Sequence, residues 1–183
     1  MAKTYLFLAD GFEEIEGLTV VDLLRRAGID ITMVSIQGDL KITGSHGIVV
    51  QADKLFSEID PEDADMLILP GGLPGTNHLA EHEGLVKALK QFYKEGKMLA
   101  AICAAPGVLG MNHILEGKRA TCFPGHEEKL LGAEYTGEKV TVDKNVITGR
   151  GMGASMEFGL EIVSHFKGKD AADKLAKSTQ FII

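Results

Sequence analysis

Short apolar runs alternate with longer segments of helical periodicity along this chain, and the alternation predicts its secondary structure. The apolar runs predict strands at residues 4–9, 29–36, 65–69 and 98–102. Apolar positions at helical spacing predict helices at residues 13–27, 77–95, 108–112, 154–166 and 171–178. Strands that alternate with helices are typical of a mostly parallel sheet with helices on both faces, so the predicted fold class is α/β.

Two hairpins are predicted where glycines or a polar turn separate short β-type segments. Residues 41–43 and 48–51 form the first, and residues 139–143 and 145–148 form the second. We find no internal repeat, low-complexity tract or linker in the sequence. The 183 residues are therefore expected to form a single domain over residues 1–183.

The composition excludes several functions and favours a soluble protein. Hydrophobic residues make up 45% of the chain and charged residues 25%, as is ordinary for a globular domain. The net charge of −7 argues against nucleic acid or an anionic membrane surface as the main partner. No apolar run is long enough to span a membrane, and the N-terminal residues lack the layout of a signal peptide. The two cysteines form no disulfide framework, so we expect a cytoplasmic protein.

Cys103 stands where the strand at residues 98–102 ends, just before Pro106 and Gly107 introduce a helical segment. A residue at such a junction is expected on a sharp turn, with its side chain exposed at the carboxyl edge of the sheet. That is the geometry of a nucleophile elbow, with cysteine in the place that serine has in hydrolases. Backbone N–H groups at the helix start would lower the pKa of the thiol. The alternative is that Cys103 is one more small buried hydrophobic residue.

The first predicted helix carries three acidic residues near its start, and one differs from the others. Glu13 and Glu14 fit a solvated first turn, where negative charge suits the helix macrodipole. Glu16 lies in line with Val20 and Leu23 on the face expected to pack on the sheet. A carboxyl group there would be partly desolvated, so its pKa would rise and it could hold a proton for a thiolate or a substrate. The alternative is that Glu16 reaches water from the edge of the helix.

Four loops are expected to meet at one crevice, because the carboxyl ends of parallel strands lie at the same edge of a sheet. They are Asp10-Gly11, Pro70-Gly71-Gly72, the turn at Cys103, and Gly149-Arg150-Gly151. The N–H groups of Gly72 and Ala104 could form an oxyanion hole, although Pro-Gly-Gly is also an ordinary end to a strand. No Gly-x-Gly-x-x-Gly or Gly-Lys-Ser/Thr motif is present, so no phosphate-binding loop is predicted.

The histidines do not predict a metal site. His78 and His82 are spaced to share a helix face, but no third ligand lies nearby in sequence, and a solvated face is the simpler interpretation. His126 is close in sequence to Cys122, and nothing in the sequence places it beside Cys103. Cys122 is interpreted as a buried structural thiol.

Five blocks of the sequence, taken together, identify a protein family more specifically than any of these features alone. The blocks are Asp10-Gly-Phe-Glu-Glu-Ile-Glu16, Val21-Asp-Leu-Leu-Arg-Arg-Ala-Gly28, Leu69-Pro-Gly-Gly72, Ala100-Ala-Ile-Cys-Ala-Ala-Pro106 and Thr148-Gly-Arg-Gly-Met-Gly153. In order and spacing they resemble the ThiJ/PfpI superfamily, in particular the branch with the Parkinson's-disease protein deglycase and its bacterial relatives. The resemblance covers essentially the whole chain.

The resemblance implies a flavodoxin-like α/β sandwich that is usually a homodimer and needs no cofactor. Cys103 then stands at the family's reactive-cysteine position. Glu16 matches the protonated glutamate that hydrogen-bonds this sulfur, and Gly72 and Ala104 match the backbone donors beside it.

Three departures from the family pattern restrict the chemistry. Peptidase-like members have a histidine directly after the cysteine, where this chain has Ala104. Some members of the deglycase branch have a histidine where this chain has Phe123, and His126 cannot be substituted for it from the sequence. An arginine that approaches the cysteine in some members corresponds to His46.

By resemblance, the expected activity is cofactor-independent chemistry of Cys103 and Glu16 on α-oxoaldehydes, as in a glyoxalase III, or on glycated proteins or nucleotides, as in a deglycase. A non-enzymatic redox sensor or holdase chaperone that acts through oxidation of Cys103 is the alternative. A cysteine amidase or peptidase is a third interpretation, for which we find no histidine partner.

Overall fold

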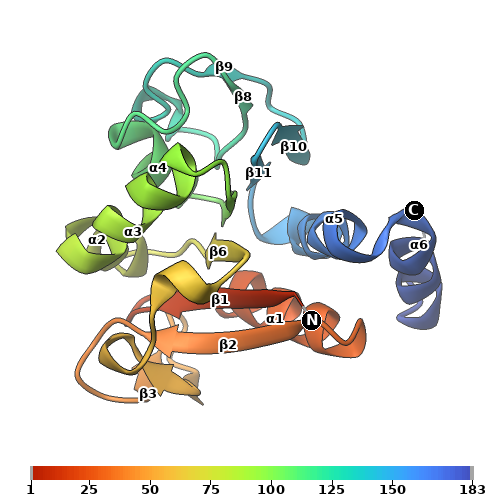
Figure 1. The fold of residues 1–183 in the computed structure, drawn as a ribbon, viewed down its shortest axis with the longest axis horizontal. Coiled ribbons are helices and arrows are strands. Elements are labelled where there is room, and N and C mark those ends of the chain that lie inside the picture. The colour runs from red at the N-terminus through yellow and green to blue at the C-terminus, as the bar shows by residue number, and fades with distance from the viewer. Residues whose placement is uncertain (1, 182–183) are drawn as a thin grey trace.

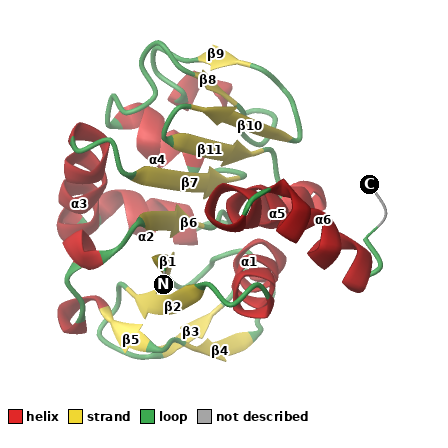
Figure 2. Cartoon of the chain, turned by 45° about the vertical axis from the view of Figure 1, so that its right-hand side comes forward, coloured by secondary structure: helices red, strands yellow, loops and turns green. Residues whose placement is uncertain are grey.

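A seven-stranded sheet forms the centre of the computed structural model, which describes residues 2–181. The strand order is β10-β11-β7-β6-β1-β2-β5, visible from top to bottom in Figure 2. Neighbouring strands are parallel except β10, which pairs antiparallel with β11. The strands of this sheet are β1 (Lys3–Leu8), β2 (Asp30–Ser35), β5 (Lys54–Leu55), β6 (Met66–Leu69), β7 (Met98–Ile102), β10 (Val140–Asp143) and β11 (Val146–Gly149).

Within residues 2–181, six α-helices cover the two faces of the sheet (Figures 1 and 2). Helices α1, α5 and α6 lie on one face, and α2, α3 and α4 lie on the other. This arrangement confirms the predicted α/β sandwich with a mostly parallel sheet. The helices are α1 (Glu14–Arg26), α2 (Gly75–Glu81), α3 (Glu83–Lys94), α4 (Pro106–Met111), α5 (Ser155–Lys167) and α6 (Lys169–Ser178).

The alternation of side chains along the central strands explains why both faces are covered. In β1, Leu6 and Leu8 point into the hydrophobic core under α1 and α5, whereas Tyr5 and Phe7 point into the core under α3. All four side chains are at most 2% exposed. A strand buried on both faces has a continuous apolar sequence, which is why the central strands were predictable from their runs.

The helical region predicted over residues 77–95 is confirmed, but it is divided into two helices, α2 and α3, a break that was not predicted. His82 has an extended backbone between them, and its ring nitrogen Nδ1 accepts a hydrogen bond of 3.0 Å from the N–H of Leu85. The side chain thereby caps the start of α3, a role that hydrophobic periodicity does not reveal.

The remaining strands lie outside the central sheet or at its edge. The predicted hairpin near residue 45 is present as β3 (Lys41–Thr43) and β4 (Val49–Gln51), which pair antiparallel. Strands β8 (Arg119–Ala120) and β9 (Glu134–Tyr135) form a small parallel pair, and like β5 they are too short to be predicted from a period-two pattern.

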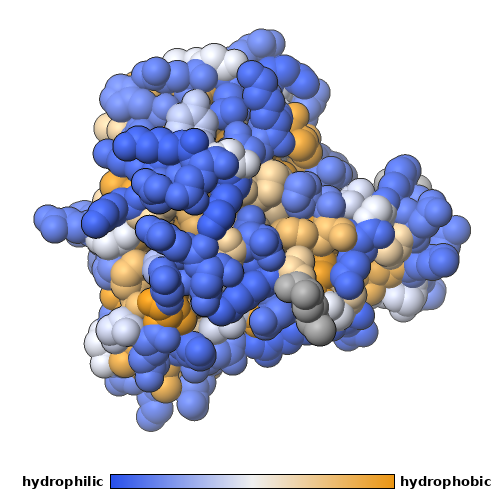
Figure 3. Space-filling view, viewed as in Figure 1, coloured by the Kyte–Doolittle hydropathy of each residue, from blue (hydrophilic) through white to orange (hydrophobic). Residues whose placement is uncertain are grey.

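The visible face in Figure 3 is largely hydrophilic, with smaller hydrophobic areas between the charged side chains. Among residues 2–181, no helix combines the length and the hydropathy that a membrane span requires. The predicted domain over residues 1–183 extends past the described part of the chain at both ends.

Candidate active site

Cys103 lies at the carboxyl end of β7 in a left-handed backbone conformation, with φ of 66°. This conformation costs a residue other than glycine about 1–3 kcal/mol, so the surroundings must hold it in place. The N–H of Cys103 donates to the Gly149 carbonyl at 2.9 Å, and its own carbonyl accepts from the N–H of Phe123 at 2.8 Å. A strained turn at this point is what a nucleophile elbow requires. The side chain is partly exposed, so the alternative of a fully buried cysteine is wrong.

Gly71 lies between the turn at Cys103 and the first helix. Its N–H donates to Glu16 Oε2 at 2.9 Å, and its carbonyl accepts from the N–H of Glu13 at 2.8 Å. A Cβ atom on Gly71 would lie 2.5 Å from Glu16 Oε2 and 2.6 Å from the Cβ of Cys103. Only glycine fits here, and the backbone of this loop is sandwiched between Glu16 and Cys103.

Glu16 is 1% exposed, on the face of α1 that packs on the sheet. The alternative in which its carboxyl group reaches water is therefore wrong. Burial raises the pKa of Glu16 to about 7, an effect that hydrogen bonds from Cys103 and Gly71 oppose and the negative charge of Glu13 reinforces. Its second oxygen, Oε1, is buried without a hydrogen bond to any described nitrogen or oxygen. A carboxyl group in this position exchanges its proton near neutral pH.

The pKa of the Cys103 thiol is raised, whereas the sequence analysis predicted that it is lowered. Burial and the negative charge of an ionised Glu16 raise the pKa of the thiol to about 12, and the N–H groups of Ala104 and Gly72 offset only part of this. The amides of Gly72 and Ala104 lower the pKa as predicted, but burial and Glu16 outweigh them. When Glu16 is protonated, its repulsion disappears and its O–H can donate to the sulfur. Cys103 and Glu16 thus behave as one group that shares a proton.

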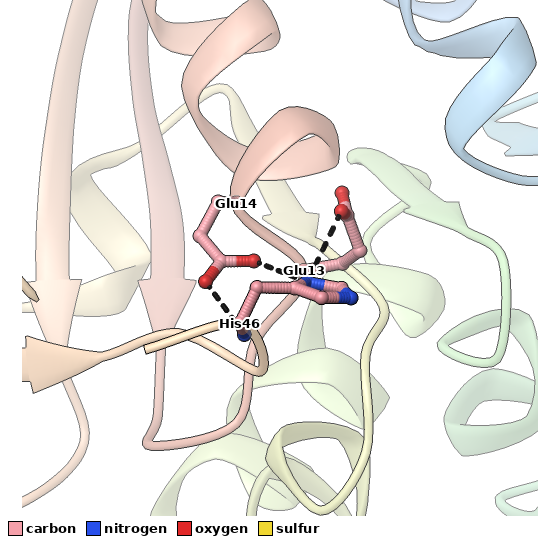
Figure 4. A group of neighbouring side chains, drawn as sticks. All are labelled: Glu13, Glu14 and His46. Carbon is pink, nitrogen blue, oxygen red and sulfur yellow. Dashed lines mark hydrogen bonds and ion pairs between the residues drawn. The ribbon is translucent and has the colours of Figure 1, made fainter. Parts of the chain in front are cut away.

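Next to this pair, Glu13, Glu14 and His46 form a second cluster, drawn in Figure 4. Glu13 is 9% exposed and Glu14 is 4% exposed, so the prediction of a solvated first turn is wrong for both. Glu13 caps α1 by accepting from the N–H of Glu16 at 2.8 Å. Glu14 accepts 2.8 Å and 2.9 Å hydrogen bonds from the backbone N–H and the ring Nδ1 of His46, on the turn between β3 and β4.

These bonds give Glu14 the properties of a permanent anion. Burial by itself would raise the pKa of Glu14, but the bonds from His46 and from the N–H of Ile48 lower it to about 2. The same contact raises the pKa of His46. Sequence analysis missed this contact, because it joins residues 32 positions apart in sequence.

The cluster has the residue types of a metal site, since ligand atoms of all three residues lie within 4.8 Å of one another. However, His46 Nδ1 is already bonded to Glu14, and the amides at the start of α1 favour anions. We therefore interpret the cluster as a clasp that fastens the hairpin to the helix.

The other histidines have structural partners. His78 Nδ1 lies 3.1 Å from the carbonyl of Asp10, and His82 caps α3 as described, so neither is simply solvated. The ring of His126 packs edge-on against Phe123 at 6.3 Å between centroids. Phe123, in the place where the resemblance predicts a histidine, is 48% exposed. Cys122 is fully buried, as predicted.

Comparisons with known sequences and structures all match the chain to one protein family. Residues 2–165 match the model of the DJ-1/PfpI family. Protein dj-1beta of Drosophila melanogaster is 35% identical over 97% of this chain and 96% of its own length. A deglycase of Pyrococcus abyssi is 31% identical, over 81% of this chain and 89% of its own. The structure of oxidized Toxoplasma gondii DJ-1 covers all of both chains with a TM-score of 0.96 and 30% identity.

Plant relatives are longer than this chain. DJ-1 homolog B of Arabidopsis thaliana is 38% identical over 94% of the chain, but the match spans only 40% of the plant protein. The chain therefore spans less than half the length of this relative, and the same holds for DJ-1 homolog A.

Proposed function

The chain belongs to the DJ-1/PfpI family, and we propose that it is a cofactor-independent cysteine enzyme that converts α-oxoaldehydes into 2-hydroxy acids. The observation that carries the proposal is the pairing of Cys103 with a buried Glu16 across Gly71, where the N–H groups of Gly72 and Ala104 lower the pKa of the thiol. This arrangement supplies a nucleophile, a proton carrier and oxyanion donors at one point.

The reaction begins when the Cys103 sulfur adds to the aldehyde carbon of a substrate such as methylglyoxal and forms a hemithioacetal. The N–H groups of Gly72 and Ala104 stabilise the developing oxyanion, and Glu16 supplies its proton. The Glu16 carboxylate then removes the hydrogen of that carbon as a proton and returns it to the neighbouring carbonyl carbon. The shift oxidises one carbon and reduces the other, so it needs no external oxidant and yields a thioester. One water cleaves the thioester, which releases the 2-hydroxy acid and restores the thiol.

The pKa of Glu16 suits its role as the proton carrier, because a group that titrates near 7 can both give and take a proton at neutral pH. The same addition to a glycated amine or thiol would be a deglycation. The Pyrococcus abyssi relative is named a deglycase, which supports this extension, and we propose protein or nucleotide adducts as the substrates. We propose further that the chain acts as a cytoplasmic homodimer, without membrane or nucleic-acid partners.

A redox sensor or chaperone is the second candidate function, and the accessibility of the Cys103 sulfur supports it. Cys103 is partly exposed, and the amides of Gly72 and Ala104 could hold the oxygens of a sulfinate. The Toxoplasma gondii relative was obtained in an oxidized form. Amidase or peptidase chemistry is less well supported, because the sulfur is paired with a carboxyl group and followed by Ala104 rather than by a histidine.

The decisive test is the formation of lactate from methylglyoxal, without glutathione or added metal, by the wild type and by Cys103→Ser. We expect turnover by the wild type and a loss of at least about 10³-fold in the variant, because the serine hydroxyl ionises far less readily than the thiol. Cys122→Ser serves as the matched control and should retain activity. If the wild type forms no lactate while Cys103 is oxidised readily by peroxide, the sensor replaces the enzyme.

A further inference from the structure

A groove of about 390 Å³ is lined by two chain segments that are hydrogen-bonded to the backbone of Cys103, and it takes no part in the steps above. One wall is formed by Phe123 and Pro124, and the other by residues 150–154. Both walls are connected to the peptide of Cys103. Its carbonyl accepts from the N–H of Phe123 at 2.8 Å, and its N–H donates to the carbonyl of Gly149 at 2.9 Å. The two segments that hold the backbone of Cys103 in place therefore also line the groove.

The lining is mainly apolar. Phe123 and Met152 are 48% and 50% exposed, so each presents a large hydrophobic surface to water. Arg150 is the charged residue of the lining, and its guanidinium is directed to the carbonyl of Gly137 at 3.1 Å.

The ring of Phe123 is supported on two sides. A Cβ atom on Gly151 would lie 3.1 Å from the ring, which shows that the ring rests close to the Gly151 backbone. The ring of His126 packs edge-on against Phe123 from another direction. A supported aromatic side chain loses little conformational entropy when a ligand covers it, so it makes a good binding surface.

We propose that Phe123 and Met152 form a subsite for the substituent on the oxo carbon of the substrate. This inference rests on the proposed function and specifies its substrate class as α-oxoaldehydes with a large apolar or aromatic group, such as phenylglyoxal. A phenyl group can cover both side chains, whereas the methyl group of methylglyoxal is too small to do so. The histidine that the resemblance predicts in place of Phe123 would present a polar ring instead.

The test compares kcat/KM for phenylglyoxal and methylglyoxal in the wild type and in Phe123→Ala. We expect Phe123→Ala to lower the value for phenylglyoxal by about 10- to 100-fold, mainly through KM, and that for methylglyoxal by less than about threefold. Met152→Ala should act in the same direction with a smaller effect. Met111, which is 56% exposed on α4 and does not line the groove, provides the matched control Met111→Ala.

An unchanged selectivity ratio in Phe123→Ala, with methylglyoxal turnover intact, would overturn the subsite and leave the proposed function standing. A second measurement needs no turnover. Benzoylformate and pyruvate carry the same two substituents but lack the aldehyde, and their protection of Cys103 against iodoacetamide is compared.

We expect benzoylformate to protect the wild type at a concentration at least about tenfold lower than pyruvate, and Phe123→Ala to lose this difference. If the wild type forms no lactate but benzoylformate still protects Cys103 better than pyruvate, the subsite is supported and the proposed reaction is not. Equal protection by the two acids overturns the subsite, whatever the turnover.

Discussion

Glu14 and Glu16 lie in the first turn of the same helix and are both buried, yet their carboxyl groups have opposite properties. They are 4% and 1% exposed. Burial acts on both, but the pKa of Glu14 is lowered to about 2, whereas the pKa of Glu16 is raised to about 7. The helix macrodipole acts on both carboxyl groups in the same direction, so it does not separate them either.

The difference lies in the donors that each carboxylate receives. Glu14 accepts from the backbone and ring of His46, and Ile48 adds a longer backbone bond of 3.4 Å. Glu16 accepts one backbone N–H, from Gly71, and has the thiol of Cys103 as its other neighbour. Buried carboxylates with many donors stay ionised, and those with few bind a proton. One turn of α1 thus provides both a structural anion and a proton carrier.

Exchange of each glutamate for glutamine tests this division most strongly. We expect Glu16→Gln to lower kcat for α-oxoaldehydes by about 10²- to 10⁴-fold, because the amide cannot carry a proton. Glu14→Gln, the matched control, should keep kcat within about threefold of the wild type at a temperature where it is folded. Steady-state lactate formation measures both. Equal losses in the two variants would contradict the assignment of Glu16 as the proton carrier.

Gly71→Ala tests the contact between the carboxyl group and the sulfur. The new methyl group would occupy the space between Glu16 and Cys103, so the pair must separate. We expect kcat/KM to fall by about 10²-fold, since small misplacements of reacting groups have effects of this size. Gly38→Ala is a control, because a Cβ atom there meets nothing within 4 Å and Gly38 does not line the groove. A fully active Gly71→Ala variant would show that the pairing is not needed.

The same two glutamate-to-glutamine substitutions should change the free energy of unfolding in opposite directions. The raised pKa of Glu16 means that the folded state binds this proton more tightly between pH 4.5 and about 7. As the pH rises from 4.5 to about 7, the free energy of unfolding therefore falls. At pH 8, Glu16→Gln should raise the free energy of unfolding by about 1–3 kcal/mol. At pH 4, where the wild-type carboxyl group is protonated, this gain should disappear.

The lowered pKa of Glu14 has the reverse consequence. Its carboxylate stabilises the fold above pH 4.5, and this contribution is lost as the pH falls towards 2. Glu14→Gln should lower the free energy of unfolding by about 2–3 kcal/mol at pH 7, because buried donors lose a charged acceptor. Urea denaturation measures both variants, and shifts of the same sign at pH 8 would refute the comparison.

The pH dependence of catalysis gives a further test of the comparison. Below about pH 7, Glu16 and Cys103 both hold protons, and above it the pair has lost one and can present a thiolate beside a carboxylic acid. We expect kcat/KM to rise about tenfold per pH unit below 7 and then to level. Glu16→Gln should remove this inflection and Glu14→Gln should keep it. An inflection that survives in Glu16→Gln would have to belong to another group.

Hydrophobic patterning was sufficient to predict most strands of the sheet, most helices and the position of Cys103 at the end of a strand. The strands around Leu67 and Leu99 are buried on both faces, so their sequences are continuously apolar and stand out. The helix break at His82 was missed because it depends on a single side-chain cap rather than on the periodicity. The placement of Glu16 on the buried face of α1 followed from helical spacing, which is a local property.

Helical spacing predicted that the pKa of Glu16 is raised, whereas only the tertiary structure decided the directions of the pKa shifts of Glu14 and Cys103. Sequence spacing placed Glu14 and Glu16 in one helical turn, but it did not show that His46 would bind the first and that Cys103 would face the second. It also led to the wrong direction for the pKa of Cys103, because the helix amides are local whereas burial and the charge of Glu16 come from distant parts of the chain. Local periodicity determines which face of an element is buried, and a pKa depends on the groups that the fold brings to that face from elsewhere.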